Sequence, residues 1–182
     1  MPKRSLKNIL VLFLLIFSVQ AHAFRSDVGI LNDSGYFKKI YSLLSGAQES
    51  IYVIMYSATF YEKYSDSPSN LLIQSLVSAA KRGVSVNVLL DQNDWTDASN
   101  SKENKKVAGI LEKGGVKVFL DRKNITTHAK LVIVDDRFVV IGSTNWTYHA
   151  LTDNNETNVV IDSKETAEEY IKYFEELKSL CK

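Results

Sequence analysis

The chain has 182 residues, with 22 Lys and Arg against 21 Asp and Glu, 45% apolar residues and one cysteine. This length suits one domain with a sizeable hydrophobic core. The near-zero net charge excludes a protein that binds nucleic acid through its overall positive charge, and a single cysteine excludes an internal disulfide. No group of cysteines and histidines has the spacing of a zinc site.

Residues 1–23 are expected to form a signal peptide. A basic head precedes the apolar run Ile9 to Phe17, and Ala21-His22-Ala23 supplies the small residues for cleavage after Ala23. The alternative is an uncleaved membrane anchor, although the run has only about half of the roughly 20 apolar residues of a spanning helix. Cleavage removes three of the 22 basic residues and no acidic one, which leaves a net charge of −2. We therefore expect a periplasmic or secreted bacterial protein with no stable membrane association.

The rest of the chain alternates between strand and helix patterns, which predicts a single α/β domain over residues 24–182. Strands are expected at 28–30, 50–56, 84–90, 116–120, 128–135, 137–141 and 158–161, and helices at 36–44, 69–82 and 163–180. The polar stretch 94–105 is expected to be a loop that leads into a further helix ending at Gly114-Gly115. This loop is either a solvated connection or a substrate contact with Trp95 as a stacking surface.

The strand pattern at 128–135 contains the most informative residues. Side chains alternate between the faces of a strand, so His128 and Lys130 are expected to point the same way. The four residues that follow Lys130 are all apolar, as in a strand buried on both faces. Asp135 has the opposite parity, which favours a role in anchoring the next loop over contact with a substrate.

The segment from Gly142 to Asn145 follows the next expected strand. Gly142 allows a turn or a close approach of the backbone, while Ser143 and Asn145 share a face and offer a hydroxyl and an amide. Together with Lys130, these two side chains can bind a phosphate group without a metal ion, because a lysine supplies a point charge and neutral donors stabilise the negative charge that develops in a reaction.

These residues resemble the signature of the phospholipase D superfamily. The match consists of His128, Lys130, Asp135, then Gly142 and Asn145 after a gap of fixed length, with Glu156 at the place of a downstream glutamate. Ser143 stands where the common version has a second glycine, a replacement familiar in the nuclease branch. In length and element order, the expected domain is similar to the small bacterial endonucleases of this family.

The resemblance implies a layered α-β-α sandwich with a mixed central sheet, and a homodimer that shares one active site. The chain has one copy of the motif, because no lysine and aspartate follow His149 at the required spacing. One His128 is then expected to attack phosphorus and form a phosphohistidine, while the second copy's His128 protonates the leaving oxygen. Glu156 is expected to orient the imidazole, and Lys130, Ser143 and Asn145 to bind phosphate. The signature as a whole, His128, Lys130, Asp135 and Glu156, marks the catalytic residues, and no divalent metal or other cofactor is required.

The active residues do not decide the substrate. A non-specific endonuclease that cleaves DNA or RNA is the first expectation, since no amphipathic membrane-binding helix is visible. A lipid phosphodiesterase of the phospholipase D type is the alternative, and a non-catalytic nucleic-acid-binding domain is a third possibility.

A few other residues are expected to have structural roles, each with a functional role as the alternative. Trp146 and Tyr148 are expected to pack more than to stack on bases, and His149 is expected to be a loop residue. Asp91 is expected to end a strand as a turn or cap residue. Cys181 is expected to be an unpaired thiol near the C-terminus, with a link to a second chain as the alternative.

Overall fold

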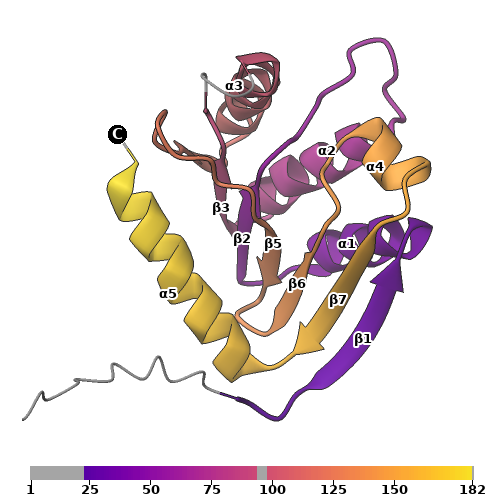
Figure 1. Cartoon of the computed structure of the whole chain (residues 1–182), viewed down its shortest axis with the longest axis vertical. Helices are drawn as coiled ribbons and strands as arrows, with labels where there is room; N and C mark the ends of the chain where they lie inside the picture. Colours follow the sequence, from indigo (N-terminus) through magenta and orange to yellow (C-terminus); the bar gives the residue numbers. More distant parts are fainter. Residues whose placement is uncertain (1–22, 94–97, 182) are drawn as a thin grey trace, which may run out of the picture.

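The structure is a computed structural model that describes residues 23–93 and 98–181. Seven strands form one sheet in the order β1-β7-β6-β5-β2-β3-β4 (Figure 1). The strands are β1 (Asp27–Asn32), β2 (Ser50–Met55), β3 (Ser85–Leu90), β4 (Lys117–Leu120), β5 (Lys130–Val134), β6 (Phe138–Gly142) and β7 (Thr157–Asp162). β2, β3 and β4 pair in parallel, whereas all other neighbours are antiparallel, so the sheet is mixed as expected.

Helices cover both faces of this sheet. They are α1 (Ser34–Gly46), α2 (Pro68–Lys81), α3 (Ala98–Lys113), α4 (Tyr148–Thr152) and α5 (Lys164–Leu180). The larger apolar core lies between the sheet and α1, α2 and α3, and includes Ile40, Leu72, Leu76 and Leu111. α5 alone packs on the opposite face, where Phe174 is fully buried against Ile54, Leu89 and Ile133 (Figure 1). The expected α-β-α sandwich is therefore confirmed. Within the described residues, no helix has the length and apolar character needed to cross a membrane.

The expectation of a loop as far as residue 105 was wrong, because α3 already begins at Ala98. Three polar residues of its first turns, Asn100, Ser101 and Asn104, are buried, whereas Ser99, Lys102 and Lys105 are exposed. Asn104 is fully buried and donates to the carbonyl oxygens of Tyr56 at 2.7 Å and Asp91 at 2.8 Å, and Asn100 donates to Tyr56 at 2.9 Å. These amides satisfy the carbonyl groups at the ends of β2 and β3, a use of polar residues that a hydropathy pattern does not reveal. Trp95 and residues 1–22 of the expected signal peptide lie outside the described residues.

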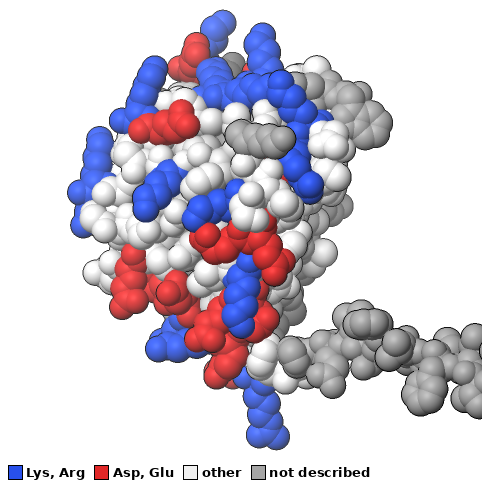
Figure 2. Space-filling model, turned by 90° about the vertical axis from the view of Figure 1, so that its left-hand side faces the viewer, with Lys and Arg blue, Asp and Glu red and all other residues white. Residues whose placement is uncertain are grey.

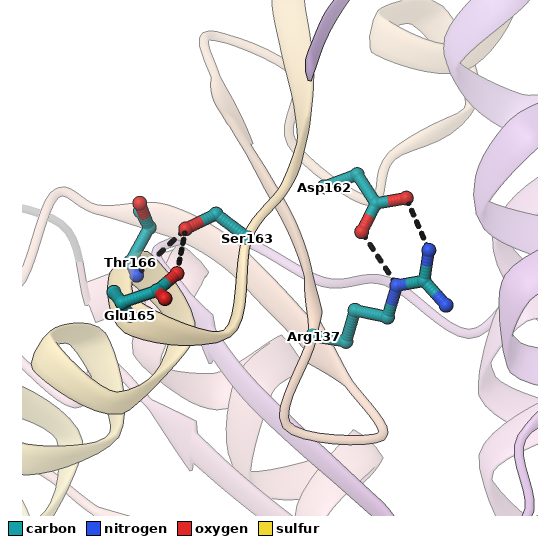
Figure 3. A network of polar contacts seen from close by, with 5 residues as sticks. All are labelled: Arg137, Asp162, Ser163, Glu165 and Thr166. Atoms are coloured by element: carbon teal, nitrogen blue, oxygen red, sulfur yellow. Dashed lines mark hydrogen bonds and ion pairs between the residues drawn. The ribbon is translucent and has the colours of Figure 1, made fainter. Parts of the chain in front are cut away.

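The end of the sheet that carries the turn between β5 and β6 is fixed by side-chain contacts. Arg137 forms a bidentate ion pair with Asp162, with distances of 2.5 and 2.7 Å (Figure 3). Ser163 caps α5, as expected, by accepting a hydrogen bond from the backbone N–H of Thr166 at 3.1 Å. These contacts join β6, β7 and α5 and leave the opposite end of the sheet for the residues of the signature.

Candidate active site

The candidate site lies at one end of the sheet, where β5 begins and β2, β3 and β6 end (upper part of Figure 1). Strand pairing brings its residues together, since Lys130 stands opposite Met55 of β2 and Gly142 stands opposite Asn158 of β7. His128 immediately precedes β5. The site is thus built from segments that are far apart in the sequence.

His128 and Lys130 point the same way, as the strand alternation predicted. Nζ of Lys130 lies 3.1 Å from Nδ1 and 3.3 Å from Nε2 of His128, and donates to the His128 carbonyl oxygen at 2.7 Å. Because an ammonium group only donates hydrogen bonds, the ring nitrogen that accepts from it carries a lone pair. This contact therefore favours the neutral form of His128, which is the form that can act as a nucleophile.

Lys130 is a buried cation, with 6% of its surface exposed. Its ammonium lies 4.9 Å from the ring centroid of Tyr56, and no carboxylate of residues 23–93 and 98–181 forms an ion pair with it. Burial lowers the pKa of Lys130, and the more distant charge of Glu156 opposes that shift. A buried positive charge without a counter-ion favours the binding of an anion.

The pKa of His128 is lowered, mainly because the protein removes part of the hydration of its ring. The Lys130 charge acts in the same direction, and Asp91 acts against both. The His128 ring also lies against Tyr56, with 4.4 Å between centroids at an interplanar angle of 53°. Lower basicity keeps His128 neutral at pH values where an ordinary histidine is partly protonated.

Asp91 belongs to the surroundings of the site, although its position at a strand end suggested an ordinary cap. It is 1% exposed, and its Oδ1 accepts a hydrogen bond from the backbone N–H of Thr127 at 2.9 Å. The Thr127 hydroxyl donates to the buried carboxylate of Asp121. Two carboxylates therefore hold the residue before His128. Asp91 also makes the expected turn contact, since it accepts from the backbone N–H of Asn93 at 3.2 Å. Its closeness to the segment of His128 was not predicted, and its position at the end of a parallel strand was the available signal.

Gly142 is required because β6 and β7 approach closely at this point. A Cβ atom on Gly142 would lie 2.3 Å from Oδ1 of Asn158 and 2.3 Å from the Thr157 carbonyl oxygen. The buried Asn158 side chain then fixes the following loop, since it donates to Oγ1 of Thr144 at 2.8 Å and accepts from the Thr144 backbone N–H at 3.3 Å. The loop that presents Ser143 and Asn145 is thus held by the protein itself.

Ser143 and Glu156 contact each other. The Ser143 hydroxyl donates to the Glu156 carboxylate and accepts from the backbone N–H of Thr157 at 3.1 Å. Glu156 also accepts from the side chain of Asn154 at 3.1 Å, and its own backbone N–H donates to Asp33 at 2.9 Å. No hydrogen bond joins Glu156 to His128 within the described residues, so the expected orientation of the imidazole by Glu156 of the same chain is not seen.

Asn145 lies between Ser143 and the buried Trp146. Its side-chain Oδ1 is buried and has no hydrogen-bond partner in the described part of the chain. Unsatisfied buried polar atoms are rare in proteins, and a role in binding or catalysis is one cause of them. The Oδ1 atom of Asn145 is therefore available to accept a hydrogen bond.

Asp135 does not join these residues, although it is part of the signature. It follows the last residue of β5, at the other end of the strand from Lys130. Its carboxylate accepts hydrogen bonds from the backbone N–H groups of Gln48 at 3.0 Å, Glu49 at 2.8 Å and Ser50 at 3.2 Å. The anchoring role predicted from strand parity is correct, but the anchored segment is the connection from α1 to β2 and not the loop that follows Asp135.

Two other expectations concern the segment after Asn145. Trp146 is 2% exposed and donates from its indole nitrogen to the Tyr36 hydroxyl at 3.1 Å, so it packs as predicted. His149 is exposed and lies 2.8 Å from the Asp153 carboxylate, and within the described residues no contact joins it to His128. It belongs to α4, a short helix that the sequence analysis did not predict. In the described part of the chain, no three His, Cys, Asp or Glu side chains cluster closely enough to hold a metal ion.

The positive charge near the site is local, as expected for a chain of low net charge. Residues 98–123 contain seven Lys and Arg against three Asp and Glu, and α3 is bonded to the ends of β2 and β3 beside His128. The face of the molecule drawn in Figure 2 carries mainly basic side chains on its upper part and mainly acidic side chains on its lower part. α5 contributes to the acidic part, with five Glu against three Lys over residues 164–180.

Comparison with known proteins agrees with the fold and the signature. A family model described as "Cardiolipin synthase, PLD-like domain" matches residues 40–178. The chain is 33% identical over 138 residues to a protein of Rickettsia bellii named phospholipase D, and 32% identical over 145 residues to the mitochondrial cardiolipin hydrolase of Xenopus laevis. These matches cover 76% and 80% of this chain. The chain therefore belongs to the phospholipase D-like family.

A solved structure shows the same fold over almost its whole length. Nuc from Salmonella typhimurium, described as a phospholipase D family member, superposes with a TM-score of 0.72 at 25% identity, covering 87% of this chain and 97% of Nuc. The two named relatives are longer, and each match spans 61% of the relative's length. Of the residues that carry the family signature in this chain, Lys130 lies against His128, whereas Asp135 lies at the other end of β5.

Proposed function

We propose that this protein is a metal-independent phosphodiesterase in which two copies of the chain share one active site. The proposal is carried by one observation: the buried ammonium of Lys130, which forms no ion pair within the described residues, lies 3.1 Å from a ring nitrogen of His128. A phosphate group placed there would meet a positive charge and a neutral imidazole at the same time.

The reaction requires two histidines. A ring nitrogen of one His128 forms a bond to phosphorus, and the bond from phosphorus to the leaving oxygen breaks as the second copy's His128 supplies that oxygen with a proton. The second His128, now neutral, takes a proton from a water molecule whose oxygen attacks phosphorus and releases the first histidine. Each His128 ends the cycle in its starting protonation state.

The other histidine among the described residues does not supply the second group. Of the two histidines in the described residues, His149 belongs to α4 and pairs with Asp153. A second copy of the chain is then the simplest source, since two-fold symmetry brings identical residues to opposite sides of one phosphate. Lys130 and Asn145 of both copies would bind the non-bridging oxygens, because the lysine ammonium and the Nδ2 group of asparagine both donate hydrogen bonds.

Nucleic acid is the substrate that we propose first. Residues 98–123 place excess positive charge on α3 and the segment leading toward His128, as a groove that follows a phosphate backbone needs. The side chains around the site contact phosphate and not bases in this scheme, so cleavage should have little sequence preference. We propose that the protein acts after export, in the periplasm or outside the cell.

A lipid phosphodiesterase is the second candidate. It is favoured by the names of the two relatives, phospholipase D and mitochondrial cardiolipin hydrolase. The same two histidines would act on a lipid phosphodiester, so the catalytic residues do not separate the two candidates.

A substrate panel tests the choice. Purified residues 24–182 would be incubated with plasmid DNA, a structured RNA, and vesicles containing cardiolipin or phosphatidylcholine, each beside His128→Ala. We expect His128-dependent cleavage of nucleic acid that weakens as salt increases, because binding releases counter-ions. Release of lipid products with both nucleic acids left intact would reject the first candidate in favour of the second.

A further inference from the structure

A hollow lies between the β2–α2 connection and α4, the helix that follows the segment of Asn145. It has a volume of about 560 Å³, which is within the range of small-ligand sites. Its walls include Tyr61, Tyr64, Asp66, Ser67, Tyr148 and His149. None of these residues takes part in the phosphate chemistry proposed above.

The walls of this pocket are unusually aromatic for an exposed surface. The rings of Tyr61 and Tyr148 are 6.5 Å apart between centroids at 80°, and those of Tyr148 and His149 are 5.5 Å apart at 85°. Tyr64 is 65% exposed and Tyr148 is 43% exposed. Exposed aromatic side chains gathered in one place commonly mark a binding surface.

The pocket is held in shape before any ligand arrives. The fully buried Asn70 accepts from the backbone N–H of Tyr61 at 2.8 Å and donates to the carbonyl oxygens of Tyr61 at 2.9 Å and Tyr64 at 2.8 Å. The Tyr61 hydroxyl accepts from the backbone N–H of Tyr148 at 3.1 Å. Preorganised walls bind a ligand without the entropic cost of ordering them.

The pocket is connected to the phosphate site by the backbone. Ser69 donates to the carbonyl oxygens of Thr59 at 2.5 Å and Trp146 at 2.6 Å, which ties the aromatic connection to the segment that carries Asn145. Tyr148 follows Asn145 by three residues, so their Cα atoms are at most roughly 11 Å apart. A nucleotide whose phosphate lies at Asn145 can therefore place a neighbouring base against Tyr148.

The polar groups of the pocket select among possible occupants. Ser67 is 4% exposed, and its hydroxyl oxygen is buried without a hydrogen-bond partner in the described part of the chain. Asp66 adds a carboxylate, which disfavours a phosphate group but accepts hydrogen bonds from the amino groups of bases. An acyl chain would leave both polar groups without partners. An unstacked nucleobase can stack on the rings and form hydrogen bonds with the polar groups at the same time.

We propose that this pocket binds one base of a single-stranded nucleic acid, next to the phosphodiester that is cleaved. The inference rests on nucleic acid being the substrate, as proposed above. Tyr64 and Tyr148 supply the stacking surface, and Ser67 and Asp66 contact the edge of the base. The pocket thereby favours unpaired strands over duplexes, whose bases are stacked and paired.

Kinetics on single-stranded oligonucleotides test this pocket. The variant Tyr64→Ala/Tyr148→Leu would be compared with wild type, with Tyr148→Phe, and with Tyr173→Leu, which removes an equally exposed tyrosine from α5. We expect the double variant to raise KM about ten-fold with little change in kcat, while the two controls behave as wild type. An oligonucleotide with an abasic residue beside one defined bond should raise the wild-type KM for that bond by a similar factor. In the double variant, the abasic residue should raise KM no further.

A binding measurement keeps the pocket testable if cleavage of nucleic acid is absent. His128→Ala protein would be titrated with six-nucleotide single strands that carry one 2-aminopurine at successive positions. We expect quenching of its fluorescence at one position, lost in the protein that also carries the two tyrosine substitutions. An unchanged KM in the double variant, or equal quenching with and without the tyrosines, would overturn the base pocket. Quenching without any cleavage would instead reject the proposed nuclease activity alone.

Discussion

The carboxylate of Asp91 accepts a hydrogen bond from the backbone N–H of Thr127, the residue before His128, at 2.9 Å. Its charge also raises the pKa of His128, against the lowering caused by burial and by Lys130. The buried Asp121 is the other carboxylate nearby, and together with burial it raises the pKa of Asp91. Asp91 is therefore a positioning residue that acts on both the place and the basicity of the histidine.

Asp91→Asn should move the pH profile of kcat/KM to lower pH. Asparagine keeps an oxygen for the Thr127 N–H but removes the negative charge that stabilises the imidazolium, so the pKa of His128 falls further. The neutral nucleophile then persists to lower pH, and the protonated histidine is lost at lower pH, so both limbs shift in the same direction. The profile of the variant would be measured beside wild type between pH 4 and 9, about the range in which a histidine titrates. Unmoved limbs, or limbs at higher pH, would contradict this role.

Ser143 and Glu156 should behave as a coupled pair. Since the Ser143 hydroxyl donates to Glu156, Ser143→Ala and Glu156→Gln each disturb the same contact. We expect each to lower kcat/KM by less than about ten-fold, and the double variant to be no slower than the slower single variant. Independent contacts of Ser143 with phosphate would instead make the two effects multiply, and a double-mutant cycle on kcat/KM separates the two cases.

Asp135 should matter for stability and not for chemistry. Its carboxylate accepts three backbone N–H groups, and its backbone has φ of 52°, in the left-handed region that asparagine tolerates better than alanine. Asp135→Ala is expected to cost about 2 kcal/mol or more of unfolding free energy, and Asp135→Asn clearly less. Urea unfolding measures both. A catalytic role would show as a large loss of kcat in folded Asp135→Asn, with stability unchanged.

Much of this fold could be predicted from sequence because the local patterns and the tertiary structure agree. The apolar run after Lys130 is buried on both faces, and the alternation of side chains correctly placed His128 beside Lys130 and Asp135 away from them. The first turns of α3 were missed because Asn100 and Asn104 are polar but buried. Their partners, Tyr56 and Asp91, are distant in sequence, so a local pattern does not contain the contact.

The candidate site could be predicted only in part, because some of its residues meet through strand pairing that a local sequence pattern does not contain. His128, Lys130 and Asn145 could be identified from spacing, whereas Asp91 and Tyr56 reach the site only through the pairing of β2, β3 and β5. Glu156 was expected to orient the His128 imidazole, but its side-chain hydrogen bonds go to Ser143 and Asn154. Which side chains a carboxylate meets depends on rotamers and loop geometry that residue spacing does not encode.

Removal of divalent metal ions should leave the activity intact. In the proposed mechanism Lys130 and Asn145 supply the positive charge and the hydrogen bonds that a metal ion supplies in other phosphodiesterases. We expect the cleavage rate in excess EDTA to equal the rate without it, within a factor of about two, on the substrate that the panel identifies. Loss of activity in EDTA that added Mg²⁺, Mn²⁺ or Ca²⁺ restores would contradict the mechanism.

The central claim is that two His128 side chains from two copies act on one phosphodiester. It is tested most directly with a heterodimer of one wild-type chain and one His128→Ala chain, co-expressed with different affinity tags, purified through both, and checked for its mass in solution. If both histidines serve one site, the heterodimer should retain less than about 1% of the wild-type rate, since loss of either the nucleophile or the acid stops the reaction. A heterodimer with half of the wild-type rate, or a fully active monomer, would show that each chain works alone and would contradict the account.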